Sequence, residues 1–125
     1  LPSLNNSIVV IAYRGKLQEE QIDEDIRNAI RSVGIGLDFN NSNSYIAILA
    51  DGILVDQFQM ADLVYVNDLL GHQLEIVADA QNTLSVLADN VRITKVNQEI
   101  TENAFQIYVY DIISGKVIEK RTLNL

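Results

Sequence analysis

The first part of the chain contains a clear apolar run and a clear hairpin pattern. Residues 7–13 read Ser-Ile-Val-Val-Ile-Ala-Tyr, and Arg14-Gly15-Lys16 ends the run. This length and this β-branched composition are typical of a buried strand. Between 45 and 59, two apolar runs flank Asp51-Gly52. An Asp-Gly pair in this setting predicts a β-hairpin, because both turn positions need positive φ angles.

Residues 17–33 have the period of an amphipathic helix. Apolar side chains recur at spacings of three and four residues, which puts them on one helix face: Ile22, Ile26, Ala29, Ile30 and Val33. Acidic residues crowd the first half, whereas Arg27 and Arg31 lie toward the end, an order that complements the helix dipole. Gly34 follows and supplies the left-handed conformation that commonly ends a helix.

The middle of the chain, 61–82, fits two interpretations. Residues 61–70 form a largely apolar segment before Gly71 that is compatible with a helix or with a strand. Residues 73–82 have apolar positions at helical spacing, although the first part of this segment also suits an extended chain. A second, short helix within 61–82 is therefore one of two expected outcomes.

The last forty residues favour strands. Two runs, 84–88 and 91–96, flank Asp89-Asn90, either as a tight hairpin or as one bent strand. An alternating run that starts at Phe105 passes through a Ser-Gly turn into a run that ends at Leu123. This pattern predicts an antiparallel pair of strands at the C-terminus.

These elements predict a single α+β domain over residues 1–125. Its expected architecture is one long amphipathic helix, at about 17–33, packed on a mainly antiparallel sheet, with the second short helix within 61–82 as an option. A chain of 125 residues has the usual size of one domain and buries enough surface for a core without disulfides or metals.

The composition excludes several kinds of chemistry. The chain has no Cys and one His, which excludes disulfides, thiolate metal sites, cysteine nucleophiles and a two-histidine metal site within one chain. A net charge of −8 argues against nucleic acid as a partner. No apolar run reaches the ~18 residues of a membrane span, and no motif indicates a cofactor. The chain starts at Leu1 without an initiator Met, so we expect a processed or trimmed product.

His72 and Glu75 are candidates for a ligand-binding or catalytic pair. On a helix, a spacing of three residues places both side chains on one face, where the carboxylate could orient the imidazole as a base or complete half of a metal site. Aspartates at 51, 56, 62 and 68 could gather after folding, but no compact Asp-x-Asp-x-Asp-Gly loop is present, so we expect no metal site. A surface histidine after a turn glycine is the simpler interpretation.

A second set of candidates lies in the C-terminal strands. Tyr108 and Tyr110 share one face of their strand. Such a face is able to bind a peptide or a sugar, although packing in the sheet core is the simpler interpretation. Lys120 and Arg121 protect the last strand against unwanted edge pairing. These four residues form the candidate interaction surface.

Both ends of the chain resemble a known family. The strand Ile-Val-Val-Ile-Ala-Tyr followed by the helix Gln18–Val33 resembles the opening of an α+β domain of bacterial envelope proteins. These proteins include the amino-terminal domain of TolB, the penicillin-binding-protein activator lipoproteins and the periplasmic part of the curli secretion channel. The closing strands are similar too, with Asn90-Val-Arg-Ile-Thr-Lys-Val and then Phe105-Gln-Ile-Tyr-Val-Tyr-Asp-Ile-Ile-Ser-Gly-Lys-Val-Ile. The resemblance implies a non-enzymatic domain of the envelope or periplasm that docks on other proteins, often within an assembly.

The leading hypothesis is a non-catalytic interaction or assembly domain, which binds another protein or itself. Its C-terminal hairpin could recruit a partner strand. The first alternative is a small ligand-binding protein or enzyme that uses His72, Glu75 and nearby aspartates. The second alternative is an acidic mimic that occupies a basic partner, which the net charge of −8 allows.

Overall fold

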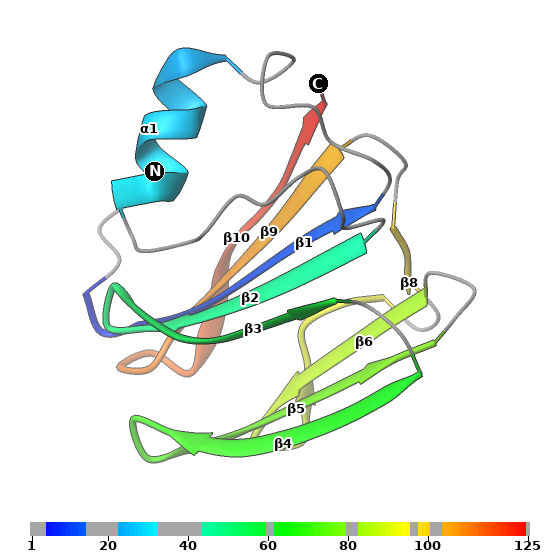
Figure 1. Cartoon of the computed structure of the whole chain (residues 1–125). Helices are drawn as coiled ribbons and strands as arrows, with labels where there is room; N and C mark the ends of the chain where they lie inside the picture. Colours follow the sequence, from blue (N-terminus) through cyan, green and yellow to red (C-terminus); the bar gives the residue numbers. More distant parts are fainter. Residues whose placement is uncertain are drawn as a thin grey trace.

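The computed structural model describes residues 5–14, 23–32, 44–59, 62–79, 83–95, 98–100 and 104–124. Within these residues nearly all of the regular structure is β-strand. Ten strands form two antiparallel sheets, and one helix accompanies them (Figure 1). The sheets lie face to face, so the described chain is a β-sandwich with a helix on one side.

Five strands form the first sheet, in the order β10 (Lys116–Asn124), β9 (Ala104–Asp111), β1 (Ser7–Arg14), β2 (Ser44–Ala50) and β3 (Ile53–Gln59). The second sheet has the order β4 (Leu63–Leu69), β5 (His72–Ala78), β6 (Thr83–Ala88) and β7 (Val91–Arg92), with β8 (Gln98–Glu99) also paired to β6. β10 and β3 are therefore the edges of the first sheet, and β4 is an edge of the second.

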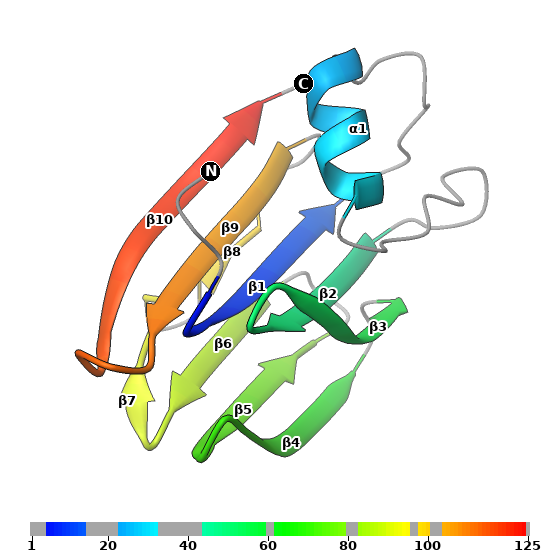
Figure 2. The same ribbon diagram turned by 90° about the vertical axis from the view of Figure 1, so that its left-hand side faces the viewer.

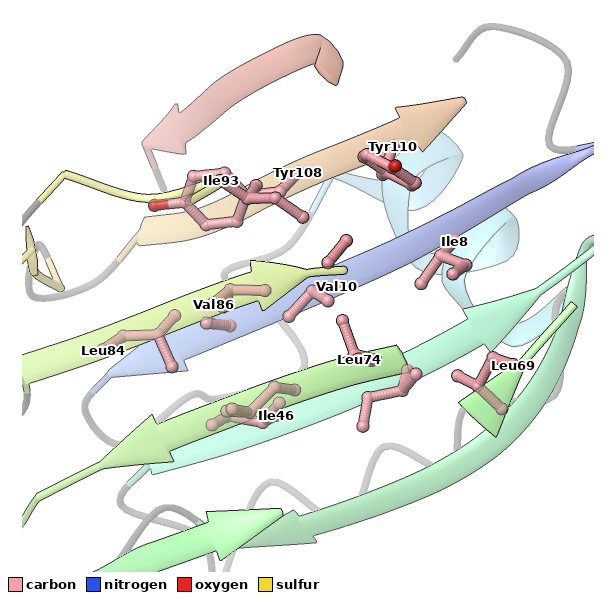
Figure 3. Close-up of a cluster of buried hydrophobic side chains, with 14 of the residues drawn as sticks. Ile8, Val10, Ile46, Leu69, Leu74, Leu84, Val86, Ile93, Tyr108 and Tyr110 are labelled. Atoms are coloured by element: carbon pink, nitrogen blue, oxygen red, sulfur yellow. The ribbon is translucent and has the colours of Figure 1, made fainter. Parts of the chain in front are cut away.

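Alternate residues of both sheets form one buried core between them. Ile8 and Val10 of β1 point toward the second sheet, where Leu74 and Ile76 of β5 belong to the same buried cluster (Figure 3). Tyr110 of β9 lies directly opposite Ile8 in the register and enters this cluster too. The two-residue period of a strand explains the arrangement, since every second side chain faces the same way.

The outer face of the first sheet is also buried. Val9 and Ile11 of β1, Leu49 of β2 and Val109 of β9 belong to a second apolar cluster on that face. The helix α1 (Glu24–Ser32) lies on the same side of the sheet (Figures 1 and 2). Burial on both faces explains why 7–13 and 105–110 are almost continuously apolar.

The α+β prediction is wrong, because the described chain is almost entirely two antiparallel sheets. The helix predicted over about 17–33 is described only as α1, which has nine residues. Asp23 is described but precedes the helix, and 17–22 and 33 lie outside the described residues. The start of α1 agrees with the sequence pattern: Asp23 accepts a hydrogen bond from the Asp25 amide, with acidic residues in the first turn and Arg31 in the last.

The optional second helix within 61–82 is wrong as well. Across 62–79 the chain forms the hairpin β4–β5, with Leu70-Gly71 at its turn. Two features hide this hairpin in the sequence. Val64 and Val66 are apolar on the exposed face of β4, which obscures the alternation. The turn itself places Leu70 at a φ of 52°, a conformation that leucine rarely adopts.

The predictions of a strand at 7–13, a hairpin at 45–59 and a C-terminal strand pair are confirmed, whereas the run 91–96 forms a strand only at Val91–Arg92. The hairpin at 45–59 turns at Asp51-Gly52, with φ angles of 53° and 78°. The alternatives around Asp89-Asn90 resolve as a tight hairpin, because both residues have positive φ and Ala88 pairs with Val91. The C-terminal strands pair as expected, and β10 contains a register shift between Val117 and Glu119.

The strained turn at Leu70 generates a stability prediction. Leu70→Asn should raise the free energy of unfolding by about 1 kcal/mol, since asparagine tolerates the left-handed region better than leucine does. Little burial is lost, because Leu70 is 42% exposed. Urea denaturation of the two proteins measures the change. Ile113→Asn is the control: Ile113 is also exposed but is not among the residues of positive φ, so it should bring no gain. An unchanged or lower stability for Leu70→Asn would contradict the assignment of strain to this turn.

Candidate functional site

His72 is the first residue of β5 and shares the inner face of that strand with Leu74 and Ile76. Its Nδ1 atom forms a hydrogen bond with the Asp89 carboxylate. Asp89 lies in the β6–β7 turn and is held in place by the neighbouring residue Gln73. The Gln73 amide donates to Asp89 Oδ1 at 2.8 Å, and the Asp89 amide donates to the Gln73 carbonyl oxygen at 2.9 Å.

Tyr110 connects this pair to the first sheet. The His72 and Tyr110 rings meet edge to face with centroids 5.6 Å apart. Burial raises the pKa of Tyr110, and the charges of Asp89 and Asp111 raise it further. The pKa of Asp89 is lowered, mainly by the hydrogen bond from the Gln73 amide and then by its bond to His72. His72, Asp89 and Tyr110 therefore form one cluster across the sandwich.

Glu75 lies away from this cluster. Residues 72–78 form a strand, and an odd spacing on a strand places two side chains on opposite faces. His72 faces the core and Glu75 faces outward, so the shared helix face expected for this pair does not exist. The residue that reaches His72 is Asp89, which sequence reasoning had placed only in a turn. The signal was the antiparallel register of β5 and β6, in which Leu74 pairs with Ala88 and brings His72 close to Asp89. The helical interpretation of 73–82 concealed this register.

The aspartates considered for a cation site are dispersed, and several take part in turns. Asp51 accepts a hydrogen bond from the Asn6 amide at 2.8 Å. Asp111, which is outside this set, accepts one from the Ser114 amide at 2.9 Å. Asp56 bonds the amide of the next residue, Gln57. Among the residues that the structure describes, no three His, Asp or Glu side chains are grouped so that they could hold a metal ion.

The tyrosines of the candidate interaction surface are core residues. Tyr108 and Tyr110 are 6% and 3% exposed and belong to the cluster between the sheets, so the packing interpretation fits them and an exposed tyrosine face does not. Lys120 and Arg121 are exposed on the edge strand β10. They point to opposite faces, because Lys120 lies opposite Tyr108 in the register and Arg121 lies opposite Ile107.

A pocket of about 270 Å³ lies where β9 and β10 meet the segment between β7 and β8. The described residues that line it are polar or charged apart from the tyrosine ring: Thr94, Lys95, Gln98, Gln106, Tyr108, Lys120, Arg121 and Thr122. Three of the four residues of the predicted interaction surface thus come together here. No local sequence pattern links the other lining residues, so the sequence analysis did not identify them: Thr94, Lys95, Gln98, Gln106 and Thr122.

The outer face of the second sheet is exposed, whereas that of the first sheet is buried. Val64, Val66 and Val77 are 69%, 54% and 38% exposed. Val64 lies directly opposite Val77, and Val66 lies opposite Glu75. Leu87 is partly exposed and lies opposite Glu75 on the next strand. We call this set the valine face: Val64, Val66, Val77, Leu87 and Glu75.

Comparison with protein-family models, with curated proteins and with solved structures found no match. The description of the fold as a two-sheet β-sandwich, and of the sites above, therefore rests on the structure of this chain alone. In the part of the chain that the structure describes, no helix has the length and apolar character needed to cross a membrane.

The lowered pKa of Asp89 predicts a pH dependence of stability. A carboxyl group whose pKa is lower in the folded than in the unfolded state stabilises the fold above its unfolded pKa, here 3.8. That contribution is lost as the pH falls through the folded value. Asp89→Asn should therefore be less stable at neutral pH and should lose less stability than the wild type below pH 3.8.

Urea denaturation over this pH range is the measurement. Asp111→Asn is the companion variant, because the pKa of Asp111 is also lowered, through hydrogen bonds from Ser114. Asp111→Asn should also reduce the loss of unfolding free energy below pH 3.8, and the double variant should reduce it further. Identical acid limbs for Asp89→Asn and the wild type would show that Asp89 is not held in its charged form by Gln73 and His72.

Proposed function

We propose that the protein is a non-catalytic protein-interaction domain that docks through the valine face, first of all on a second copy of itself. The observation that carries the proposal is the difference between the two outer faces. The first sheet has its outer face buried by the chain, whereas the valine face exposes three valines on adjacent strands. Contiguous apolar surface of this kind commonly marks an interaction site.

The charges on this face support a second copy as the occupant. Glu75 lies among the apolar residues and is partly buried. Arg92 of β7 lies opposite Leu87 and therefore on the same face. In an interface with two-fold symmetry the same patch is used twice, so Glu75 of one copy is able to meet Arg92 of the other. A face with apolar residues and both charge signs is self-complementary in this way.

Salt gives the proposed association a characteristic response. Each copy carries a net charge of −8, so two copies repel each other at low ionic strength. Added salt screens this repulsion and leaves apolar contacts intact. Association through the valine face should therefore be stronger at high salt.

The two alternative functions and the cellular location stay predictions. A joint role of His72 and Glu75 in one small-molecule site needs both side chains on one face, and β5 has them on opposite faces. The acidic mimic needs carboxylates that are free to meet a partner, whereas Asp51, Asp89 and Asp111 bond backbone amides. The location in the bacterial envelope is what the family resemblance implies.

Light scattering in line with size-exclusion chromatography tests the proposal. The wild type should form a dimer whose population rises with protein concentration and with salt. Val66→Lys should raise the dimer dissociation constant about tenfold or more, because it places a charge in an apolar contact. Ile113→Lys is the matched control: Ile113 is 77% exposed but lies in the β9–β10 turn, away from the valine face. It should dimerise like the wild type. A wild-type protein that stays monomeric at every protein concentration, at both low and high salt concentration, would contradict the proposal.

A further inference from the structure

The pocket beside β10 has a charge that differs from that of the molecule as a whole. The chain has nine basic residues against seventeen acidic ones, yet Lys95, Lys120 and Arg121 all line this one pocket. At physiological ionic strength charges are screened beyond about 8 Å. The potential in the pocket is therefore set by the groups that line it and not by the distant carboxylates.

Two of the three cations have no carboxylate partner among the residues that the structure describes. Within the described part of the chain, neither Lys95 nor Lys120 forms an ion pair, whereas Arg121 lies 3.8 Å from Glu119. Glu99, which follows the pocket residue Gln98, pairs with Arg14 at 3.4 Å. Among the described residues, no acidic side chain therefore neutralises the two lysine charges of the pocket.

The β-bulge in β10 brings Lys120 to this position. The register shift between Val117 and Glu119 places Val117 opposite Tyr110 and Lys120 opposite Tyr108. Both tyrosines face the core, so Lys120 lies on the inner face of the edge strand and Val117 covers the core beside it. A β-bulge commonly re-aims a side chain in this manner.

The base of the pocket is built from buried polar side chains. Gln106 and Thr94 are 5% and 3% exposed. The Tyr108 hydroxyl donates to Gln106 Oε1 at 3.3 Å, and Thr94 Oγ1 accepts a hydrogen bond from the Val86 amide at 3.1 Å. These bonds fix the orientation of the amide and hydroxyl groups, which are suited to a ligand with several hydroxyls.

From this combination we infer that the pocket binds a small hydroxylated anion, of the sugar phosphate or sugar acid type. Lys95 and Lys120 would hold the acidic group, and the amide and hydroxyl side chains would hold the sugar hydroxyls. A volume of about 270 Å³ lies just below the range of about 300–1,000 Å³ for drug-sized ligands and suits a molecule of monosaccharide size. This site is separate from the valine face and does not depend on the proposed function.

The test is an NMR titration of the full ¹⁵N-labelled chain with glucose 6-phosphate, glucuronate and glucose. An anion that binds should shift the amides of Lys95, Lys120 and Thr122 in a saturable way, while glucose at the same concentration should not. Saturation by glucose 6-phosphate alone identifies a phosphorylated ligand, and saturation by glucuronate alone identifies a carboxylated one. No saturable shift with either anion, or equal shifts with glucose, would overturn the inference.

Charge-removing variants separate this pocket from general surface attraction. Lys95→Gln and Lys120→Gln should each weaken the binding of the anion about 3- to 5-fold, as expected for one exposed ion pair, and the double variant about tenfold or more. Both lysines are exposed, so the core stays intact, which the NMR spectra verify. Lys116→Gln makes the same change on the same strand outside the pocket and should leave affinity within twofold. An equal loss with Lys116→Gln would overturn the inference as well.

Discussion

The packing of the two sheets against each other is the constraint on which the rest of the structure depends. β1 and β9 are central to it, because they bury side chains on both faces, one set toward the second sheet and one set under the side that carries α1. Full burial of an Ile, Val or Leu side chain contributes about 1.5–3 kcal/mol relative to exposure. The cluster between the sheets contains more than ten buried apolar residues, so it outweighs any single surface contact. The ends of the strands and the hairpin turns then follow from the need to bring the two inner faces together.

Surfaces that this core does not use are the places where function can reside. The first sheet has both faces buried and retains only its edges, β3 and β10. The second sheet has one face in the core and the other exposed. The sandwich therefore leaves an apolar face on one sheet and a basic pocket beside the edge of the other. His72, Asp89 and Tyr110 connect the two sheets at the turns. His72 pairs with the Asp89 carboxylate, which also accepts a hydrogen bond from the Gln73 amide.

The sequence patterns predicted strands where turn chemistry and strand composition agreed. Asp51-Gly52 and the Ser-Gly turn before β10 are ordinary turn signals between apolar runs, and both hairpins formed where expected. The prediction failed where those signals were absent: Leu70 occupies a turn position that usually needs Gly or Asn, and Val64 and Val66 make both faces of β4 apolar. The helical period assigned to 73–82 also led to the wrong pairing of His72 with Glu75, because these two residues share a face on a helix but not on a strand. The pocket was beyond sequence reasoning, since Lys95 and Lys120 meet only through the pairing of distant strands.

Salt would separate the two binding activities proposed above, because their electrostatics have opposite signs. Two copies that meet through the valine face bring two chains of charge −8 together, so screening of their repulsion strengthens the contact. An anion that enters the pocket is attracted by Lys95 and Lys120, so the same screening weakens it. The two sites also lie on different sheets, with Val66 on the outer face of the second sheet and Lys120 on the inner face of the first. A ligand in one site therefore does not sterically block the other. Removal of the positive charge of Lys120 should slightly increase the repulsion between two copies, because each copy becomes more negative, and it should leave the apolar contact unchanged.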